Sequence, residues 1–160
     1  MWFFMLTCYL MSLLSFFFLL IGFLQSFLRF HVFAADHVTF MVLTSIVYFF
    51  TETLVIFFYV GTGVSIRDYT KEHHMDQGFH QRSIAIKRRV YPPLLLNMLF
   101  MIVLFVLVGA VDTQRFPMWA YQGIFAGCLV HYVWVKIHQN GCFKDNTKII
   151  LDMSGINKQV

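Results

Sequence analysis

Residues 2–28 read WFFMLTCYLMSLLSFFFLLIGFLQSFL, and this stretch decides the fold class. It is long enough to cross a bilayer, because an α-helix rises about 1.5 Å per residue and about 20 residues span the hydrocarbon core. No charged side chain precedes Arg29. A cleaved signal peptide would begin with basic residues and would have an apolar core of only about 7–15 residues. We therefore expect a permanent transmembrane helix.

The rest of the chain has the same apolar character. Its 160 residues are 59% hydrophobic and only 12% charged, and 20 of them are phenylalanine. The mean hydropathy is +0.68. A soluble domain of this size exposes too much surface to hide so many apolar side chains. The composition therefore predicts that lipid is the main solvent.

Three further apolar runs of transmembrane length follow, at about residues 38–60, 92–111 and 117–137. The runs are continuous and do not alternate with polar residues, which favours helices over the strands of a membrane barrel. The predicted fold class is all-α: an integral membrane protein with a four-transmembrane-helix antiparallel bundle over residues 1–138.

Glycine and proline predict where these helices begin and end. The GTG sequence at 61–63 predicts the end of the second helix, because glycine is common just past a helix C-terminus. Pro92 and Pro93 predict the start of the third helix and Pro117 that of the fourth, because the first turn does not use the missing N–H. The segment 61–91 is then expected to be a basic inner loop.

Lysine and arginine are distributed unevenly over the connections. The loop 61–91 holds six of them and the chain from Lys136 through the inner tail 139–160 holds four, whereas two lie on the other side. The positive-inside rule predicts both termini on the inner, cytoplasmic-type side of a bacterial inner membrane or an organellar inner membrane. Anionic lipid headgroups are the expected partners of Lys87, Arg88 and Arg89, which directly precede the third span. No stacking platform or recognition helix accompanies them, so no nucleic-acid partner is expected.

Two titratable side chains lie well inside the spans. Glu52 is about eight residues, or roughly 12 Å, from the inner end of the second span, and His131 is about seven residues, or roughly 10 Å, from the inner end of the fourth. Tyr48 lies one turn from Glu52 on the same helix face, and Asn97 falls in the inner half of the third span. We expect these four side chains to form a polar cluster inside the bundle.

Three interpretations of this cluster are open. The first is a hydrogen-bond network that only holds the bundle together, worth about 0.6–2 kcal/mol. The second is a proton relay or a lining for a quinone head group, with Glu52 as acceptor and His131 as titrating partner. The third is that Glu52 faces a partner subunit. A b-type haem needs two ligands at one depth, so it would require a histidine from another chain or the rim pair His31 and His37.

Two further motifs predict contacts. Gly123 and Gly127 in GIFAG form a GxxxG element, which lets helix backbones approach closely. We expect this element on the inward face of its helix, together with His131. The loop 61–91 carries four side chains that resemble a ligand set, His73, His74, Asp76 and His80, but Gly78 interrupts the helix that would bring them onto one face, so no metal site is expected.

No sequence motif of soluble catalysis is present. The sequence therefore favours a small non-catalytic accessory or structural subunit of a larger bioenergetic membrane complex. Its expected partners are other membrane subunits, which the GIFAG face, the basic loop and the C-terminal tail would contact, and anionic lipids. The alternative is a redox or proton-handling subunit of electron transport that borders a quinone or a b-type haem through Glu52 and His131.

Overall fold

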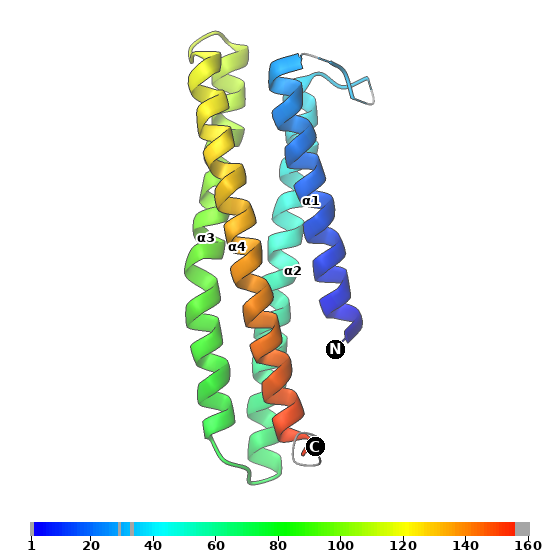
Figure 1. Cartoon of the computed structure of the whole chain (residues 1–160), viewed down its shortest axis with the longest axis vertical. Helices are drawn as coiled ribbons and strands as arrows, with labels where there is room; N and C mark the ends of the chain where they lie inside the picture. Colours follow the sequence, from blue (N-terminus) through cyan, green and yellow to red (C-terminus); the bar gives the residue numbers. More distant parts are fainter. Residues whose placement is uncertain (1, 29, 33, 156–160) are drawn as a thin grey trace.

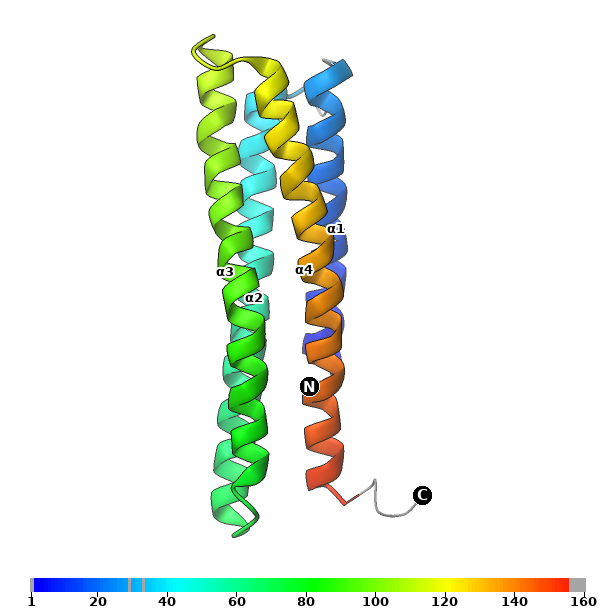
Figure 2. The same ribbon diagram turned by 60° about the vertical axis from the view of Figure 1, so that its left-hand side comes forward.

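The computed structural model of the chain describes residues 2–28, 30–32 and 34–155. Four helices follow one another along the chain: α1 (Trp2–Leu28), α2 (His37–Glu72), α3 (Gly78–Asp112) and α4 (Met118–Met153). They form an antiparallel bundle (Figures 1 and 2), and no strand longer than an isolated bridge occurs in the described ranges. The prediction of an all-helical, four-helix fold is confirmed.

Three of the helices, α1, α2 and α3, are long and apolar enough to cross a membrane. Helix α4 has the same length as α2, 36 residues, but it is not among these three. Its sequence is less apolar because Gln122, His131 and Lys136 interrupt it. The expected fourth span is therefore the least hydrophobic helix of the bundle.

The predicted ends of the second and third helices are wrong. Helix α2 continues through the GTG sequence to Glu72, and α3 begins at Gly78 with Pro92 and Pro93 in its interior. Only residues 73–77 separate the two helices, so most of the expected inner loop 61–91 is helical. The inner tail is helical as far as Met153. Pro117, in contrast, is the N-cap of α4, at the predicted position.

Apolar packing explains why the helices continue. Ile66, Ile86 and Ile149 come from these continuations and are buried together in one hydrophobic cluster. The gain from burying each such side chain, about 1.5–3 kcal/mol, exceeds the cost of about 1 kcal/mol for a glycine inside a helix. Gly63 also has a packing role, because a Cβ added there would collide with the ammonium end of Lys87.

Helix α1 is shorter than the other three helices, and its N-terminus does not reach the lower end of the bundle (Figures 1 and 2). It packs against α2 and α4, while α3 packs against the other sides of the same two helices. Beyond Trp2, helices α2, α3 and α4 continue as a three-helix extension. Two ion pairs join α3 to α4 there, Arg82 with Asp152 at 3.0 Å and Arg89 with Asp145 at 3.2 Å. Their side chains are 23–57% exposed, so each pair is worth only about 0–1 kcal/mol.

The buried apolar residues form two clusters rather than one continuous core. The upper cluster includes Leu19, Met41 and Phe125. The lower cluster includes Val55 and Phe143. The side chains that lie between the two clusters are polar, and they form the candidate site.

Candidate functional site

A polar layer crosses the bundle between the two hydrophobic clusters. We define it by seven residues that come from all four helices: Ser12, Ser15, Thr51, Glu52, Asn97, His131 and Lys136. Ser12 and Ser15 lie near the middle of α1, which begins at Trp2 and ends at Leu28. In a membrane that α1 crosses from end to end, the polar layer would therefore lie near the midplane.

An ion pair is the centre of the polar layer. Glu52 is fully buried, and its Oε1 lies 2.9 Å from Nζ of Lys136. The Asn97 amide donates a hydrogen bond to the same carboxylate oxygen at 3.3 Å. The Lys136 side chain is 17% exposed. Glu52 is therefore paired by one cation and one amide, each from a different helix.

Four members of the layer were not identified from the sequence: Ser12, Ser15, Thr51 and Lys136. Lys136 is the charged one among them, and the positive-inside count places it with the inner tail. Side chains on a helix point toward its N-terminus, and lysine has a long flexible stem. Lys136 accordingly reaches back over the ring of Tyr132, with Nζ 5.1 Å from the ring centroid. Its ammonium also donates to Gln139 Oε1 at 3.1 Å. An acidic and a basic residue near one level of two spans was the signal that could have revealed the pair.

Asn97 lies between Glu52 and His131. Its Oδ1 is 3.2 Å from Nδ1 of His131, so the imidazole meets the carboxylate only through the amide. The imidazole also packs edge-on against Phe100, with ring centroids 4.8 Å apart. The structure thus brings together Glu52, Asn97 and His131, with the amide between the acid and the imidazole. Tyr48 is buried one turn away, where its ring packs against Tyr132.

Hydroxyl groups attach α1 to the same layer. The hydroxyls of Ser15 and Thr51 are hydrogen-bonded at 2.7 Å, which joins α1 to α2. The Tyr132 hydroxyl donates to the Ser12 carbonyl at 2.8 Å, which joins α4 to α1. Each neighbouring pair of helices is therefore joined by at least one side-chain hydrogen bond at the level of the layer.

Two oxygens in the layer have no hydrogen-bond partner among the described residues, Glu52 Oε2 and Ser12 Oγ. The cavity that Tyr48 and Asn97 line has a volume of only about 10 Å³. Such a space holds about one water molecule and is too small for a quinone head group. The layer can hold a proton or a water, but a quinone does not fit beside Tyr48 and Asn97.

The predicted packing glycines lie elsewhere. Gly123 and Gly127 are exposed on α4, and nothing lies within 4 Å of a Cβ added at either position. The expectation that they face inward is wrong, because a step of four residues turns a helix by about 40° beyond a full turn. His131 lies on the flank toward Asn97, and the glycines lie on the outside.

The basic residues before the third predicted span differ in their surroundings. Arg88 is exposed, and Arg89 pairs with Asp145. Lys87 packs over Gly63. Arg88 and Arg89 are therefore both exposed to the surroundings, while Arg89 and Lys87 also contact a neighbouring helix.

The four side chains that resemble a metal-ligand set in the sequence lie around the turn between α2 and α3. They are His73, His74, Asp76 and His80. His73 stacks on the Tyr69 ring at 4.0 Å, and the Asp76 carboxylate accepts from the Gly78 N–H at 2.9 Å. No group of three or more histidine, cysteine, aspartate or glutamate side chains in the described part of the chain is arranged to hold a metal ion. Local contacts account for His73 and Asp76.

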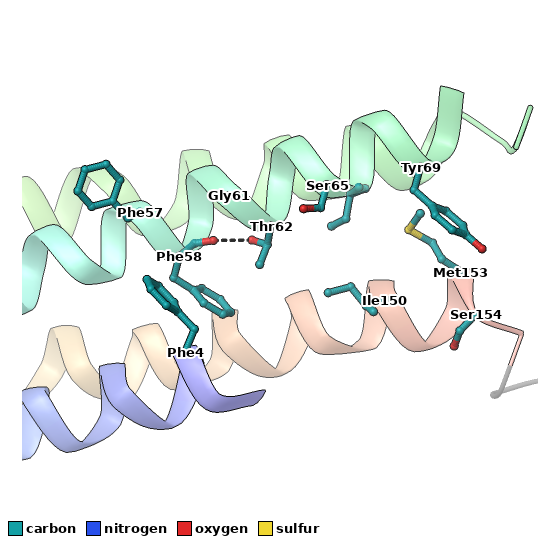
Figure 3. Close-up of a pocket in the computed structure, with 11 residues that line it drawn as sticks. Phe4, Phe57, Phe58, Gly61, Thr62, Ser65, Tyr69, Ile150, Met153 and Ser154 are labelled. Atoms are coloured by element: carbon teal, nitrogen blue, oxygen red, sulfur yellow. Dashed lines mark hydrogen bonds between the residues drawn. The ribbon is translucent and has the colours of Figure 1, made fainter. Parts of the chain in front are cut away.

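An apolar groove of about 550 Å³ opens between α2 and α4 below the N-terminus of α1. Figure 3 shows Phe4 and Phe58 at one end and Tyr69 with Met153 at the other. The Thr62 hydroxyl donates a hydrogen bond to the Phe58 carbonyl at 2.8 Å. The groove exists because α1 is shorter than the two helices that it would otherwise cover.

Comparisons with known proteins give no relative. No protein-family model matches the chain. No match was found among curated proteins or among solved structures.

Proposed function

We propose that the chain is an integral membrane protein with both termini on the inner side, and that it is a small non-catalytic subunit which joins another membrane protein through α4. Support for membrane insertion comes from the three helices that are long and apolar enough to cross a bilayer. The lysines and arginines gathered at the lower end support the orientation. Exposed small and apolar residues on α4 support its association with another membrane protein.

A single feature carries this proposal, and we call it the α4 stripe. It consists of Gly123, Gly127, Val130, Trp134, Ile137 and Gly141, all of them exposed. Their spacing alternates between four and three residues, the repeat with which two helices pack along a shared seam. Val130 is 72% exposed and Ile137 is 69% exposed, so the bundle itself does not use this seam.

The small residues distinguish the α4 stripe from a surface made only for lipid. Helices in a membrane gain little from apolar burial against each other, and they associate where small residues allow close packing. Gly123 and Gly127 provide such a surface, because no described residue of another helix lies within 4 Å of a Cβ added at either position. The partner that fits is a transmembrane helix of another protein.

The charges below the α4 stripe favour a different protein over a second copy of this chain. Lys144 and Lys148 are exposed and continue the same spacing past Gly141. In a parallel pair of two identical α4 helices these lysines would face each other and repel. A partner helix that carries acidic residues at its inner end would instead be attracted.

Photo-crosslinking from the α4 stripe tests this function. A photoreactive residue at Val130 is expected to give one discrete crosslinked product in native membranes. Val106 on α3 is the matched control, since it is 63% exposed and also apolar, and it is expected to give lipid adducts only. Equal protein crosslinking from both positions, or a product made of two copies of this chain, would contradict the proposal.

A second candidate function is proton handling at the polar layer. It is favoured by Glu52 Oε2, a fully buried oxygen without a partner among the described residues. His131 is partly exposed and is joined to Glu52 through Asn97, so it could exchange protons with the surface of the bundle.

Infrared difference spectra recorded during a pH titration test the second candidate. A buried carboxyl that takes up a proton is expected to give a C=O band that disappears in Glu52→Gln. Glu72→Gln, at the exposed end of α2, is the control and should keep the band. If the spectra of wild type and Glu52→Gln are the same, Glu52 does not exchange protons and its role is structural.

A further inference from the structure

A second cavity, of about 620 Å³, lies at the upper end of the bundle, where the α1–α2 and α3–α4 connections meet the helix ends. Its polar lining comes from all the surrounding segments and consists of Gln25, His31, Asp36, His37, Asp112 and Gln114. Apolar side chains complete the walls, among them Val38, Val108, Phe116 and Met118. The cavity is therefore amphipathic, and it shares no lining residue with the polar layer or the α4 stripe.

Gln25 gives this cavity an unpaired acceptor. The side chain is 2% exposed, and its Nε2 donates to the carbonyls of Phe30 at 2.9 Å and Ala35 at 3.3 Å. These two bonds fix the orientation of the amide, because only the NH2 group can donate. The other end, Oε1, is buried without a hydrogen-bond partner. An unpaired buried acceptor is unfavourable, so this atom requires an N–H or O–H donor.

The lining combines two carboxylates, Asp36 and Asp112, with two imidazoles, His31 and His37. The described lining contains no lysine or arginine. Hydrogen bonds from the Thr39 side chain and from the Thr39 backbone N–H lower the pKa of Asp36, so it is ionised at neutral pH. The cavity thus presents two carboxylates and one neutral amide acceptor, with the His31 imidazole close enough to Asp36 to contribute to the lowering of its pKa.

We propose that the upper cavity binds a primary ammonium group carried on an apolar body, with Gln25 Oε1 and the carboxylates of Asp36 and Asp112 as its acceptors. A primary ammonium has three N–H donors and a positive charge. A quaternary ammonium has the charge but no donor, and an anion would be repelled by both carboxylates. The apolar walls accept the hydrocarbon part. Two sources share this chemistry, the headgroup of an ethanolamine phospholipid and a free alkylamine.

Titration of the purified full-length chain in detergent with two matched ligands tests the site. Hexylamine and hexyltrimethylammonium have the same charge and tail, but only hexylamine has N–H donors. We expect hexylamine to bind at least tenfold more tightly. Asp112→Asn is expected to weaken hexylamine binding about tenfold, a loss of about 1.4 kcal/mol. Removing a negative charge from a helix C-terminus does not destabilise the helix, so unfolding does not explain a loss.

Glu72→Gln is the control, because it removes an exposed carboxylate at the lower end and should leave hexylamine binding unchanged. Native mass spectra in mixed phosphatidylethanolamine and phosphatidylcholine identify the source of the ammonium group. Selective retention of the ethanolamine lipid, lost in Asp112→Asn, identifies a lipid headgroup. Hexylamine binding without lipid preference identifies a free amine. Equal affinity for the two hexyl ligands, or wild-type hexylamine affinity in Asp112→Asn, would overturn the proposal.

Discussion

Replacing Lys136 with methionine is expected to lower the free energy of unfolding by about 3–5 kcal/mol, the usual cost of removing one partner of a buried ion pair. Glu52 is fully buried, so its carboxylate cannot reach water once the ammonium is gone. The Asn97 amide keeps one hydrogen bond but does not neutralise the charge. Methionine retains an unbranched stem that can pack over Tyr132 as Lys136 does. Circular dichroism during SDS titration in mixed micelles measures the change.

Three variants separate the ion pair from a general effect of substitution. Glu52→Gln is expected to cost less than Lys136→Met, because the Lys136 ammonium keeps its hydrogen bond to Gln139 Oε1 and the substituted amide still offers it an oxygen. Combining the two substitutions should restore at least about 2 kcal/mol relative to the sum of the single losses. Lys144→Met, an exposed lysine on the same helix, should stay within about 0.5 kcal/mol of wild type. If Lys136→Met and Lys144→Met behave alike, the pair does not stabilise the bundle.

The number of helices and the level of the polar side chains could be predicted from the sequence, because both follow from the length of apolar runs. Residues 2–28 and the later runs are continuous. Because a helix rises by a constant distance per residue, the position of a residue in its run predicts its depth in the bundle. Glu52, Asn97 and His131 accordingly lie together. Which atoms pair could not be predicted, because this depends on the rotation of each helix and on the reach of Lys136.

The helix ends and the orientation of the glycines were predicted less well, for a different reason. Local signals at 61–63 and at Pro92 compete with packing against distant residues, and the sequence does not show that Ile149 packs with Ile66. The packing outweighs the local signals and continues the helices. The GxxxG pattern that contains Gly127 indicates that another helix can approach closely. It does not indicate whether that helix belongs to the same chain or to a partner.

Isoleucine at both Gly123 and Gly127 is expected to reduce association with the partner more than tenfold while leaving the fold of this chain intact. A Cβ added at either position meets no atom of another helix within 4 Å in the described part of the chain. At a close helix crossing, however, two branched side chains would force the backbones apart and remove the packing that holds membrane helices together. Unchanged helix content by circular dichroism would exclude unfolding as the cause.

Gly61 and Gly109 provide the matched control. They are exposed glycines on α2 and α3, again with nothing within 4 Å of an added Cβ. Isoleucine at both positions adds the same volume to a different surface of the bundle. Association with the partner should therefore be unchanged in the control and reduced only when the α4 stripe is altered.

Native mass spectrometry of the protein extracted from its own membranes in mild detergent tests the central claim most directly. The account predicts a complex in which the 18.9 kDa chain is accompanied by a different membrane protein. This complex should persist with isoleucine at Gly61 and Gly109 and dissociate with isoleucine at Gly123 and Gly127. A lone 18.9 kDa species in the wild type, or a partner that the altered α4 stripe retains as well as the wild type does, would contradict the account.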